Sequence, residues 1–305
     1  MRPTTLKTAG VLLGGALCIS MAATAHAGAV GPINTGAYTG PVEIQYNGFT
    51  TEAGVTASTN ETTWGAGFIT NIFEFGNSSN IFYSNAIPGV QRIGYVLYGI
   101  ADANIRGPVG GPFQIFNTGC TGGPCDGKIH IDFYALPNAT GTNFGVADPA
   151  GLTVADRALA GGWDQFDGIT NVVGGSLLMK WELVAGIQTV DVAGGTDPLF
   201  DETLATLIQN VSSTTLPATG DGDFLADCIS GPACALFDTN GQTAGSDFFG
   251  QFSLSASLTS QNLINGWEGR TSDPVETAVI PEPISAGLFG FGILGLGLLR
   301  RRLAA

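Results

Sequence analysis

Charged side chains are scarce in this sequence, and the basic ones are the scarcest. Asp, Glu, Lys and Arg make up 12% of the 305 residues, against about 25% in an average globular protein. Intrinsic disorder requires few apolar residues and a high density of charge, so a chain that is 44% apolar is expected to fold. The 11 basic residues face 25 acidic ones, and the net charge of −14 excludes the basic surface that a nucleic-acid partner requires.

Catalytic motifs are also missing. No G-x-S-x-G, H-E-x-x-H or P-loop motif occurs, and no G-x-G-x-x-G follows a strand. A Ser-His-Asp triad would need His130 as its base, but strand alternation places it beside Lys128 and Asp132 on a polar face, as an exposed structural residue. We therefore expect no catalytic residues. A glycoside hydrolase needs only two carboxylates about 5–10 Å apart, and no spacing among the acidic residues singles out such a pair.

The first 27 residues have the three parts of an export signal. Arg2 and Lys7 give a positive start, an apolar stretch follows over Ala9–Ala23, and 25–27 read Ala-His-Ala. This apolar stretch is short for a membrane span of about 20 residues. We expect residues 1–27 to be a signal peptide that signal peptidase removes after Ala27.

The other end carries an uncharged run over Ile284–Leu299, followed by Arg300, Arg301 and Arg302. As a helix the run would span about 24 Å, a little short of the hydrocarbon core of a bilayer at about 30 Å. By the positive-inside preference, the arginine cluster would stay cytoplasmic and place the rest of the chain across the inner membrane. The sequence thus predicts a C-terminal transmembrane helix, and Pro281-Glu282-Pro283 stands directly before it.

Together, Pro281, Glu282, Pro283, the Gly-rich apolar run and the arginine cluster resemble the PEP-CTERM sorting signal of Gram-negative bacteria. The resemblance covers about residues 280–302, and it implies processing by an exosortase, with Pro281–Pro283 as the recognition element. It also implies a transient inner-membrane anchor with the body in the periplasm, followed by delivery to the cell surface or extracellular matrix. The acidic body with cysteine-bearing loops also resembles flocculation-associated members, although no body motif is matched.

Residues 28–279 are then the exported domain, and residues 280–305 the sorting signal. The body has many apolar alternations separated by Gly-rich turns, which predict an all-β fold, mainly an antiparallel β-sandwich of two sheets. Strands are expected over 42–49, 68–75, 81–84, 93–101, 113–116, 128–135, 177–183 and 252–258. One or two short helices are expected, over 197–211 (apolar residues at helical spacing) and 152–160, with a long loop over 214–227.

Four cysteines remain in the body, as Cys120/Cys125 and Cys228/Cys234. Because an export signal predicts an oxidising compartment, two local disulfides are the simplest pairing, although three pairings are formally open. A four-cysteine zinc site is the competing interpretation, which the wide spacings and the exported location disfavour.

Binding sites are suggested by two further groups of residues. Asp238, Asn240 and Asp247 supply oxygen ligands for calcium, but the loop lacks the Gly and the Glu of an EF-hand, and an Asx-rich turn explains it as well. Trp163 and Trp267 stand in Gly-flanked polar surroundings, where they could stack on sugar rings, whereas the inward phase of Trp181 makes it a core residue.

The leading hypothesis is a non-enzymatic exported protein of the cell surface or extracellular matrix. Its role would be structural or adhesive, in biofilm or floc formation, with extracellular polysaccharide as a partner and no cofactor other than the calcium considered above. A carbohydrate-binding module, with or without calcium, is the second hypothesis, and a surface glycoside hydrolase is the third.

Overall fold

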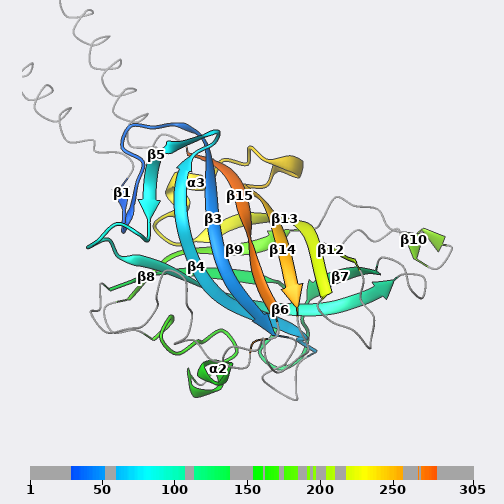
Figure 1. Ribbon diagram of the computed structural model, residues 1–305. Helices are drawn as coiled ribbons and strands as arrows, with labels where there is room; N and C mark the ends of the chain where they lie inside the picture. The colour runs from blue at the N-terminus through cyan, green and yellow to red at the C-terminus, as the bar shows by residue number, and fades with distance from the viewer. Residues whose placement is uncertain are drawn as a thin grey trace, which may run out of the picture.

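The computed structural model describes a mostly β chain (Figure 1). The described residues are 29–51, 60–106, 113–137, 154–160, 162–171, 175–184, 191–192, 195–196, 204–209, 218–256, 267 and 269–279. The strands are β1 (Ala29–Val30), β2 (Ile33–Asn34), β3 (Gly40–Thr51), β4 (Thr63–Glu74), β5 (Asn77–Ser84), β6 (Arg92–Arg106), β7 (Phe113–Gly119), β8 (His130–Leu136), β9 (Ser176–Val184), β10 (Asp191–Val192), β11 (Gly195–Thr196), β12 (Leu204–Gln209), β13 (Ala218–Ser230), β14 (Phe248–Ala256) and β15 (Gly269–Val279). The helices are α2 (Ala155–Ala160), α3 (Cys234–Phe237) and the 3-10 turn Thr243–Gly245.

The main sheet closes on itself. Its strands run in the order β6-β8-β9-β13-β14-β15-β3-β4, and β4 then pairs with β6, which completes an eight-stranded antiparallel barrel. The predicted all-β, mainly antiparallel fold is confirmed, but its layers differ from the expectation. One closed sheet stands in place of two packed sheets, because the β4–β6 pairing joins strands that a sandwich would leave as edges.

One side of the barrel is built in two tiers. The first half of β6 pairs with β8, and its second half pairs with β7. In the same way β13 pairs with β12 over its first half and with β9 near its end. Gly99 lies where β6 passes from one partner to the other, with a φ of +86°, and a Cβ there would lie 2.4 Å from the carbonyl oxygen of Lys128. A side chain at this crossing would therefore force the two tiers apart.

The barrel interior is filled by side chains from all eight strands. One inward residue from each strand in sequence order is Ile44, Ile69, Tyr95, Phe133, Trp181, Phe224, Phe248 and Val275. The ring centroids of Trp181 and Phe248 lie 3.9 Å apart, and those of Phe133 and Trp181 lie 4.4 Å apart. The predicted core role of Trp181 and the predicted inward alternation from Ile129 to Ala135 are both confirmed.

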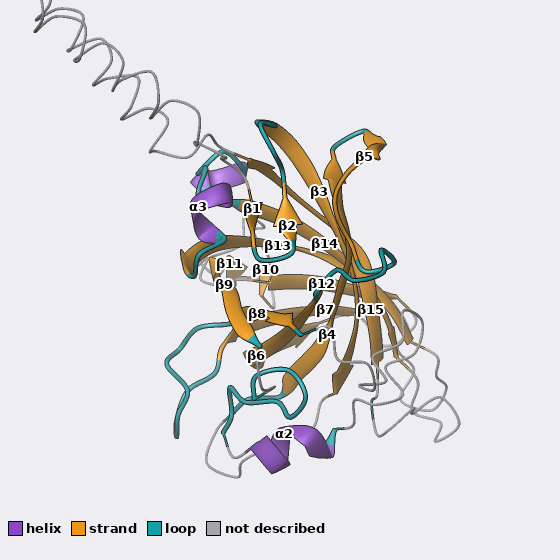
Figure 2. Cartoon of the chain, turned by 90° about the vertical axis from the view of Figure 1, so that its left-hand side faces the viewer, coloured by secondary structure: helices purple, strands orange, loops and turns teal. Residues whose placement is uncertain are grey.

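A second apolar cluster lies on the outside of the barrel. Trp64 and Val96 project from β4 and β6, and Phe166 and Ile169 from the segment that follows α2 pack onto them. Figure 2 shows α2 outside the barrel, below the strands. The helix expected over 152–160 is confirmed in α2, and we call residues 154–171 the cover segment.

Two sequence predictions are wrong. Leu204–Gln209, expected within a helix, form strand β12, and Ala218–Asp227, expected as a loop, belong to strand β13. Strand pairing is the physical reason in both places. β12 bonds to β7 on one side and to β13 on the other, so two rows of backbone hydrogen bonds outweigh the local helical spacing. β13 bonds to β12 and β14 over the stretch that was expected as a loop.

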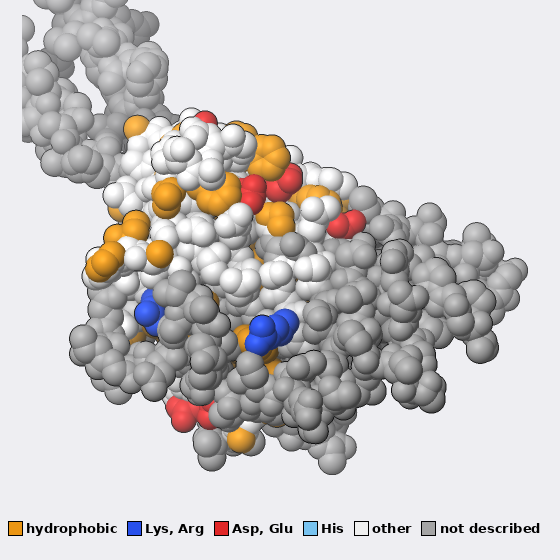
Figure 3. Space-filling model, in the orientation of Figure 1, with side chains coloured by type: hydrophobic (Ala, Val, Ile, Leu, Met, Phe, Trp, Pro, Cys, Tyr) orange, Lys and Arg blue, Asp and Glu red, His pale blue; other side chains and the backbone are white. Residues whose placement is uncertain are grey.

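The predicted export signal, Pro281–Pro283 and the arginine cluster lie outside the described residues. No helix within the described ranges combines the length and the hydrophobicity needed to span a bilayer. On the face in Figure 3, the described surface is mainly uncharged, with scattered hydrophobic side chains and small separate groups of acidic and basic ones.

Candidate functional site

Titratable groups gather on the outer face of β6, β8 and β9. Asp132 lies directly opposite Lys180, and His130 lies opposite both Tyr98 and Glu182. His130 and Asp132 were expected on an exposed face, and this prediction is wrong, since both residues are buried. The ring of Trp163, from the cover segment, meets Tyr98 and His130 edge-on, so this face is covered by residues far away in the sequence.

Asp132 is the centre of this cluster and is 1% exposed. Its Oδ2 lies 2.7 Å from Lys180 Nζ and accepts a hydrogen bond from the Tyr98 hydroxyl at 3.1 Å. Its Oδ1 is buried and has no hydrogen-bond partner among the described residues. Burial raises the pKa of Asp132, although Lys180 and Tyr98 act in the opposite direction. Burial, followed by the charge of Asp132, likewise raises the pKa of Tyr98.

His130 pairs with Asp126 at the edge of the same cluster. Its Nε2 lies 3.0 Å from Asp126 Oδ2, and its ring stacks on Tyr98 at 5.1 Å between centroids. Burial opposes ionisation of Asp126, but the hydrogen bond and charge of His130, together with hydrogen bonds from backbone amides, lower the pKa of Asp126. The hydrogen bonds of the ring go to Asp126, and among the described residues none joins the ring to a serine or cysteine, as a triad would require.

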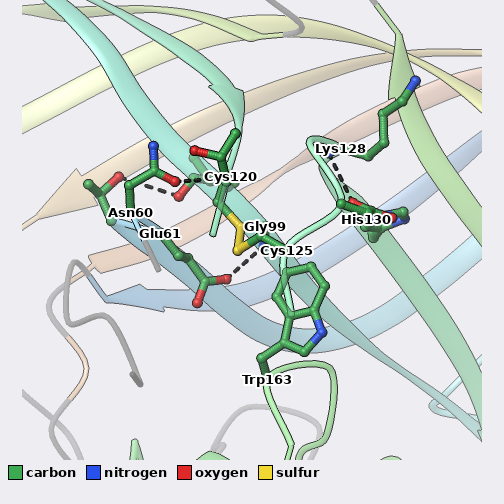
Figure 4. Close-up of a disulfide and its surroundings, with 12 residues drawn as sticks. Asn60, Glu61, Gly99, Cys120, Cys125, Lys128, His130 and Trp163 are labelled. Carbon is green, nitrogen blue, oxygen red and sulfur yellow. Dashed lines mark hydrogen bonds and ion pairs between the residues drawn. A yellow bond between two sulfur atoms is a disulfide. The ribbon is translucent and has the colours of Figure 1, made fainter. Parts of the chain in front are cut away.

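Glu61, which lies near the Cys120–Cys125 disulfide (Figure 4), forms a buried ion pair with Arg157. Arg157 of α2 reaches Glu61 Oε2 at 2.9 Å, and both side chains are almost fully buried. Glu61 also accepts a hydrogen bond from the Gly99 amide at 2.7 Å, and Arg157 Nε donates to the Trp163 carbonyl at 2.8 Å. Burial lowers the pKa of Arg157, and Glu61 opposes that shift. The pair therefore fastens the cover segment to the barrel at the crossing point of β6.

Sequence reasoning missed this pair. The two residues are 96 positions apart, and no local motif joins them. The available signal was the rarity of basic residues, because an arginine in the helix expected over 152–160 of an acidic chain requires a partner if that helix is buried.

Both predicted disulfides are present. Cys120 bonds to Cys125 and Cys228 bonds to Cys234. The first closes a loop that Cys120 ties to β6, where its amide donates to the Gly99 carbonyl at 2.7 Å. The second joins the end of β13 to the start of α3. Each disulfide therefore fixes a loop where strands end, and the zinc alternative for these four cysteines is excluded.

The loop proposed for calcium is organised by Asp247, whose carboxylate binds the protein's own backbone. Oδ1 accepts hydrogen bonds from the amides of Thr239 and Asn240, both at 2.7 Å, and Oδ2 accepts one from Cys228 at 2.9 Å. Asp238 Oδ1 accepts a hydrogen bond from the Asn240 side chain. In the part of the chain that is described, no three His, Cys, Asp or Glu side chains group to hold a metal ion. The Asx-turn interpretation fits this geometry, because Asp247 binds backbone amides of its own loop and of β13.

The two tryptophans proposed for glycan contact differ. Trp267 is 1% exposed and packs between Trp64 and Phe166, so its proposed contact with sugar is wrong. Its polar sequence neighbours gave no sign of these partners, which come from β4 and the cover segment. Trp163 is partly exposed and lies over the polar cluster, where its ring meets Tyr98 at 4.8 Å between centroids.

In comparisons with known proteins, no family model matches the chain, and no curated protein or solved structure matches it either. The site and the sequence are therefore the basis for assigning a function.

Proposed function

We propose that this chain is an exported protein of the cell surface or extracellular matrix, with a structural or adhesive role and no catalytic activity. The observation that carries the proposal is the pair of local disulfides, because structural disulfides form and persist in oxidising compartments. The export signal expected over 1–27 and the sorting signal expected over 280–305 agree with it. Signal peptidase and an exosortase would be the processing partners.

The described titratable groups support a non-enzymatic role. The Asp247 carboxylate accepts hydrogen bonds from backbone amides, and the Glu61 carboxylate binds one backbone amide and Arg157. Asp126 pairs with His130. The bonds of Asp247 to Cys228 and of Glu61 to Arg157 tie separate segments of the fold together, and the Asp126–His130 pair is local. A catalytic centre would instead hold a nucleophile, base and orienting group around an open position.

An adhesive role is supported by apolar side chains left in water. Phe75, Ile81 and Ile87 are each about half exposed, and they lie on the β4–β5 hairpin and the turn that follows it. Such residues supply contact area for association with matrix components. The acidic net charge keeps the protein apart from its own copies in solution.

Deletion of the gene in its source cell tests the role. We expect weaker cell aggregation, restored by the wild-type chain and not by a chain in which Pro281, Glu282 and Pro283 are replaced by alanine. Unchanged aggregation after deletion would overturn the structural role. Turnover of a polysaccharide by the purified barrel would replace it with the hydrolase hypothesis.

Carbohydrate binding is the second candidate, and the partial exposure of Trp163 beside Tyr98 and His130 favours it. Aromatic faces stack on sugar rings, and the surrounding charged groups can bond to hydroxyls. Replacement of Trp163 by Ala preserves the backbone carbonyl that holds Arg157, so the cover segment keeps this anchor. We expect at least a tenfold loss of affinity for acidic polysaccharide, about 1.4 kcal/mol, with Ile229→Ala as an exposed control. Equal binding by the wild type and both variants would show that Trp163 does not contact the polysaccharide.

A further inference from the structure

Asp132 and Lys180 hold an amine against a buried carboxyl group across two neighbouring strands. They are directly opposite in the β8–β9 register, and Nζ lies 2.7 Å from Oδ2. From this geometry we propose that they condense into an intramolecular isopeptide bond that links β8 to β9. The inference goes beyond the proposed function and does not depend on it, because the reaction needs only the folded barrel.

The position of the two groups favours the reaction. Side chains directly opposite on antiparallel strands have Cβ atoms about 5 Å apart, so the long lysine chain can bring Nζ onto the short aspartate without moving the backbone. Groups that are held in contact react with effective concentrations of about 10⁵–10⁸ M. The folded barrel fixes the register of the two residues, since both strands are bonded to neighbours on both sides.

The surroundings of Asp132 favour a neutral product. The residue is 1% exposed, Oδ2 accepts a hydrogen bond from the Tyr98 hydroxyl, and Oδ1 has no hydrogen-bond partner among the described residues. Burial of a carboxylate that lacks part of its hydrogen bonding is costly, whereas an amide carries no charge. Burial also raises the pKa of Asp132, and this shift increases the fraction of the neutral acid that an amine can attack.

The chemistry balances without any co-reactant. One proton passes from the Lys180 ammonium to Asp132 Oδ2, which leaves a neutral amine beside a neutral acid. The Nζ lone pair then attacks Cγ and forms the C–N bond. The Cγ–Oδ2 bond breaks, and Oδ2 leaves as water with the first proton and a second one from Nζ, while Oδ1 becomes the amide oxygen. The Tyr98 hydroxyl, which donates to Oδ2, assists this departure.

A second lysine provides an internal control. Lys128 Nζ lies 2.7 Å from Glu182 Oε1, the same separation as in the first pair. Those side chains are 52% and 23% exposed, against 31% and 1% for Lys180 and Asp132. Because water stabilises both charges of the exposed pair, Lys128 should stay a free ammonium. Proximity without burial is thus tested in the same molecule.

Tryptic mapping of the exported, folded and then reduced chain tests the proposal. Trypsin cleaves after Lys128, Arg157, Lys180 and Arg270, and acylated lysine resists it. We expect peptide 129–157 to be joined to an uncleaved 158–270, with a mass lower than the sum of the two by one water. We also expect normal cleavage after Lys128.

The variant Lys180→Arg keeps the ion pair and the tryptic site but has no amine to acylate, so it should release free 129–157, 158–180 and 181–270. Asp132→Ala should also release separate peptides. Release of free 129–157 and 158–180 from folded wild-type protein with both disulfides closed would overturn the proposal. A branched peptide at Lys128 as well would show that proximity alone is enough for bond formation, and it would overturn the argument from burial.

Discussion

At the scale of single residues, buried carboxylates are the informative feature of this protein. Asp247 binds three backbone amides, and Glu61 binds an arginine and one amide. Asp132 faces a lysine, and one of its oxygens has no hydrogen-bond partner among the described residues. The first two have the hydrogen bonds that a buried charge requires. Asp132 lacks part of them, and this difference separates a structural carboxylate from a reactive one.

The role of Asp247 predicts the outcome of its removal. Asp247→Ala leaves the amides of Cys228, Thr239 and Asn240 without their acceptor, so we expect the free energy of unfolding to fall by about 2–4 kcal/mol. Urea unfolding measures this change. Asp238→Ala, at an exposed position in the same loop, should stay within about 0.5 kcal/mol.

The same loop predicts that chelators have no effect. Since Asp247 already accepts hydrogen bonds from the backbone, addition of EDTA should leave the wild-type melting temperature unchanged. A lower melting temperature in EDTA, or an Asp247→Ala variant as stable as wild type, would contradict this account of the loop.

At the scale of elements, the cover segment explains why the outer face of β6 and β8 is dry. It places Phe166 and Ile169 on the barrel, and Arg157 fastens it to Glu61. Without this segment, Trp64 and Trp267 would face water along with the polar cluster. We therefore expect the second apolar cluster and the polar cluster to become exposed together when this segment detaches.

A double-mutant cycle tests that fastening. Arg157→Met or Glu61→Leu alone leaves an unpaired buried charge, so each should lower the free energy of unfolding by about 3–5 kcal/mol. The double variant buries no charge, and we expect it to lose less than the sum of the single variants by about 2 kcal/mol or more. Additive losses would show that the two side chains act independently.

Sequence patterns predicted strands well where one face of the strand points into the barrel interior. The alternation from Ile129 to Ala135 identified strand β8 and its inward face, because an interior face needs apolar residues at every second position. The pattern failed for the outward face of the same strand. His130 and Asp132 look exposed in the sequence, but both are buried, and Trp163, some 30 residues later in the chain, lies against the His130 ring.

Predictions also failed where the structure depends on which strands pair. Leu204, Leu207 and Ile208 have helical spacing, but two neighbouring strands supply their backbone hydrogen bonds. Of the candidate site residues, the cysteine pairs could be predicted because each pair is local in the chain. The Asp132–Lys180 contact could not, because its two residues meet only through strand register.

At the scale of the whole molecule, a packed barrel with fixed loops and a low density of charge suits a durable extracellular component. Its interior is occupied by aromatic and aliphatic side chains from all eight strands, and recognition would therefore take place on the outer surface. The two disulfides and the proposed isopeptide bond would all restrict the unfolded chain, which increases resistance to unfolding.

Buried tyrosines predict how the whole molecule responds to alkali. Burial raises the pKa of Tyr83 to about 12, and it also raises the pKa values of Tyr95, Tyr98 and Tyr134. In the unfolded chain these groups ionise near pH 10. The stability that they contribute is therefore complete below about pH 10 and is lost as the pH rises through the higher folded-state values.

Phenolate absorbance and circular dichroism recorded on the same samples check this prediction. Ionisation of most of the six tyrosines should coincide with unfolding, and it should shift to near pH 10 in denaturant. A smooth titration near pH 10 with unchanged circular dichroism would contradict the burial described for these rings.

The central claim is that this chain is exported and sorted, and mass spectrometry of its termini after cell fractionation tests it most directly. In cells with the sorting enzyme, the account predicts a surface or matrix product that begins at Gly28 and ends near Pro281. Cells without the enzyme should hold a longer form in the inner membrane. A product found in the cytosol, or one that still ends at Ala305 in cells with the enzyme, would contradict the account.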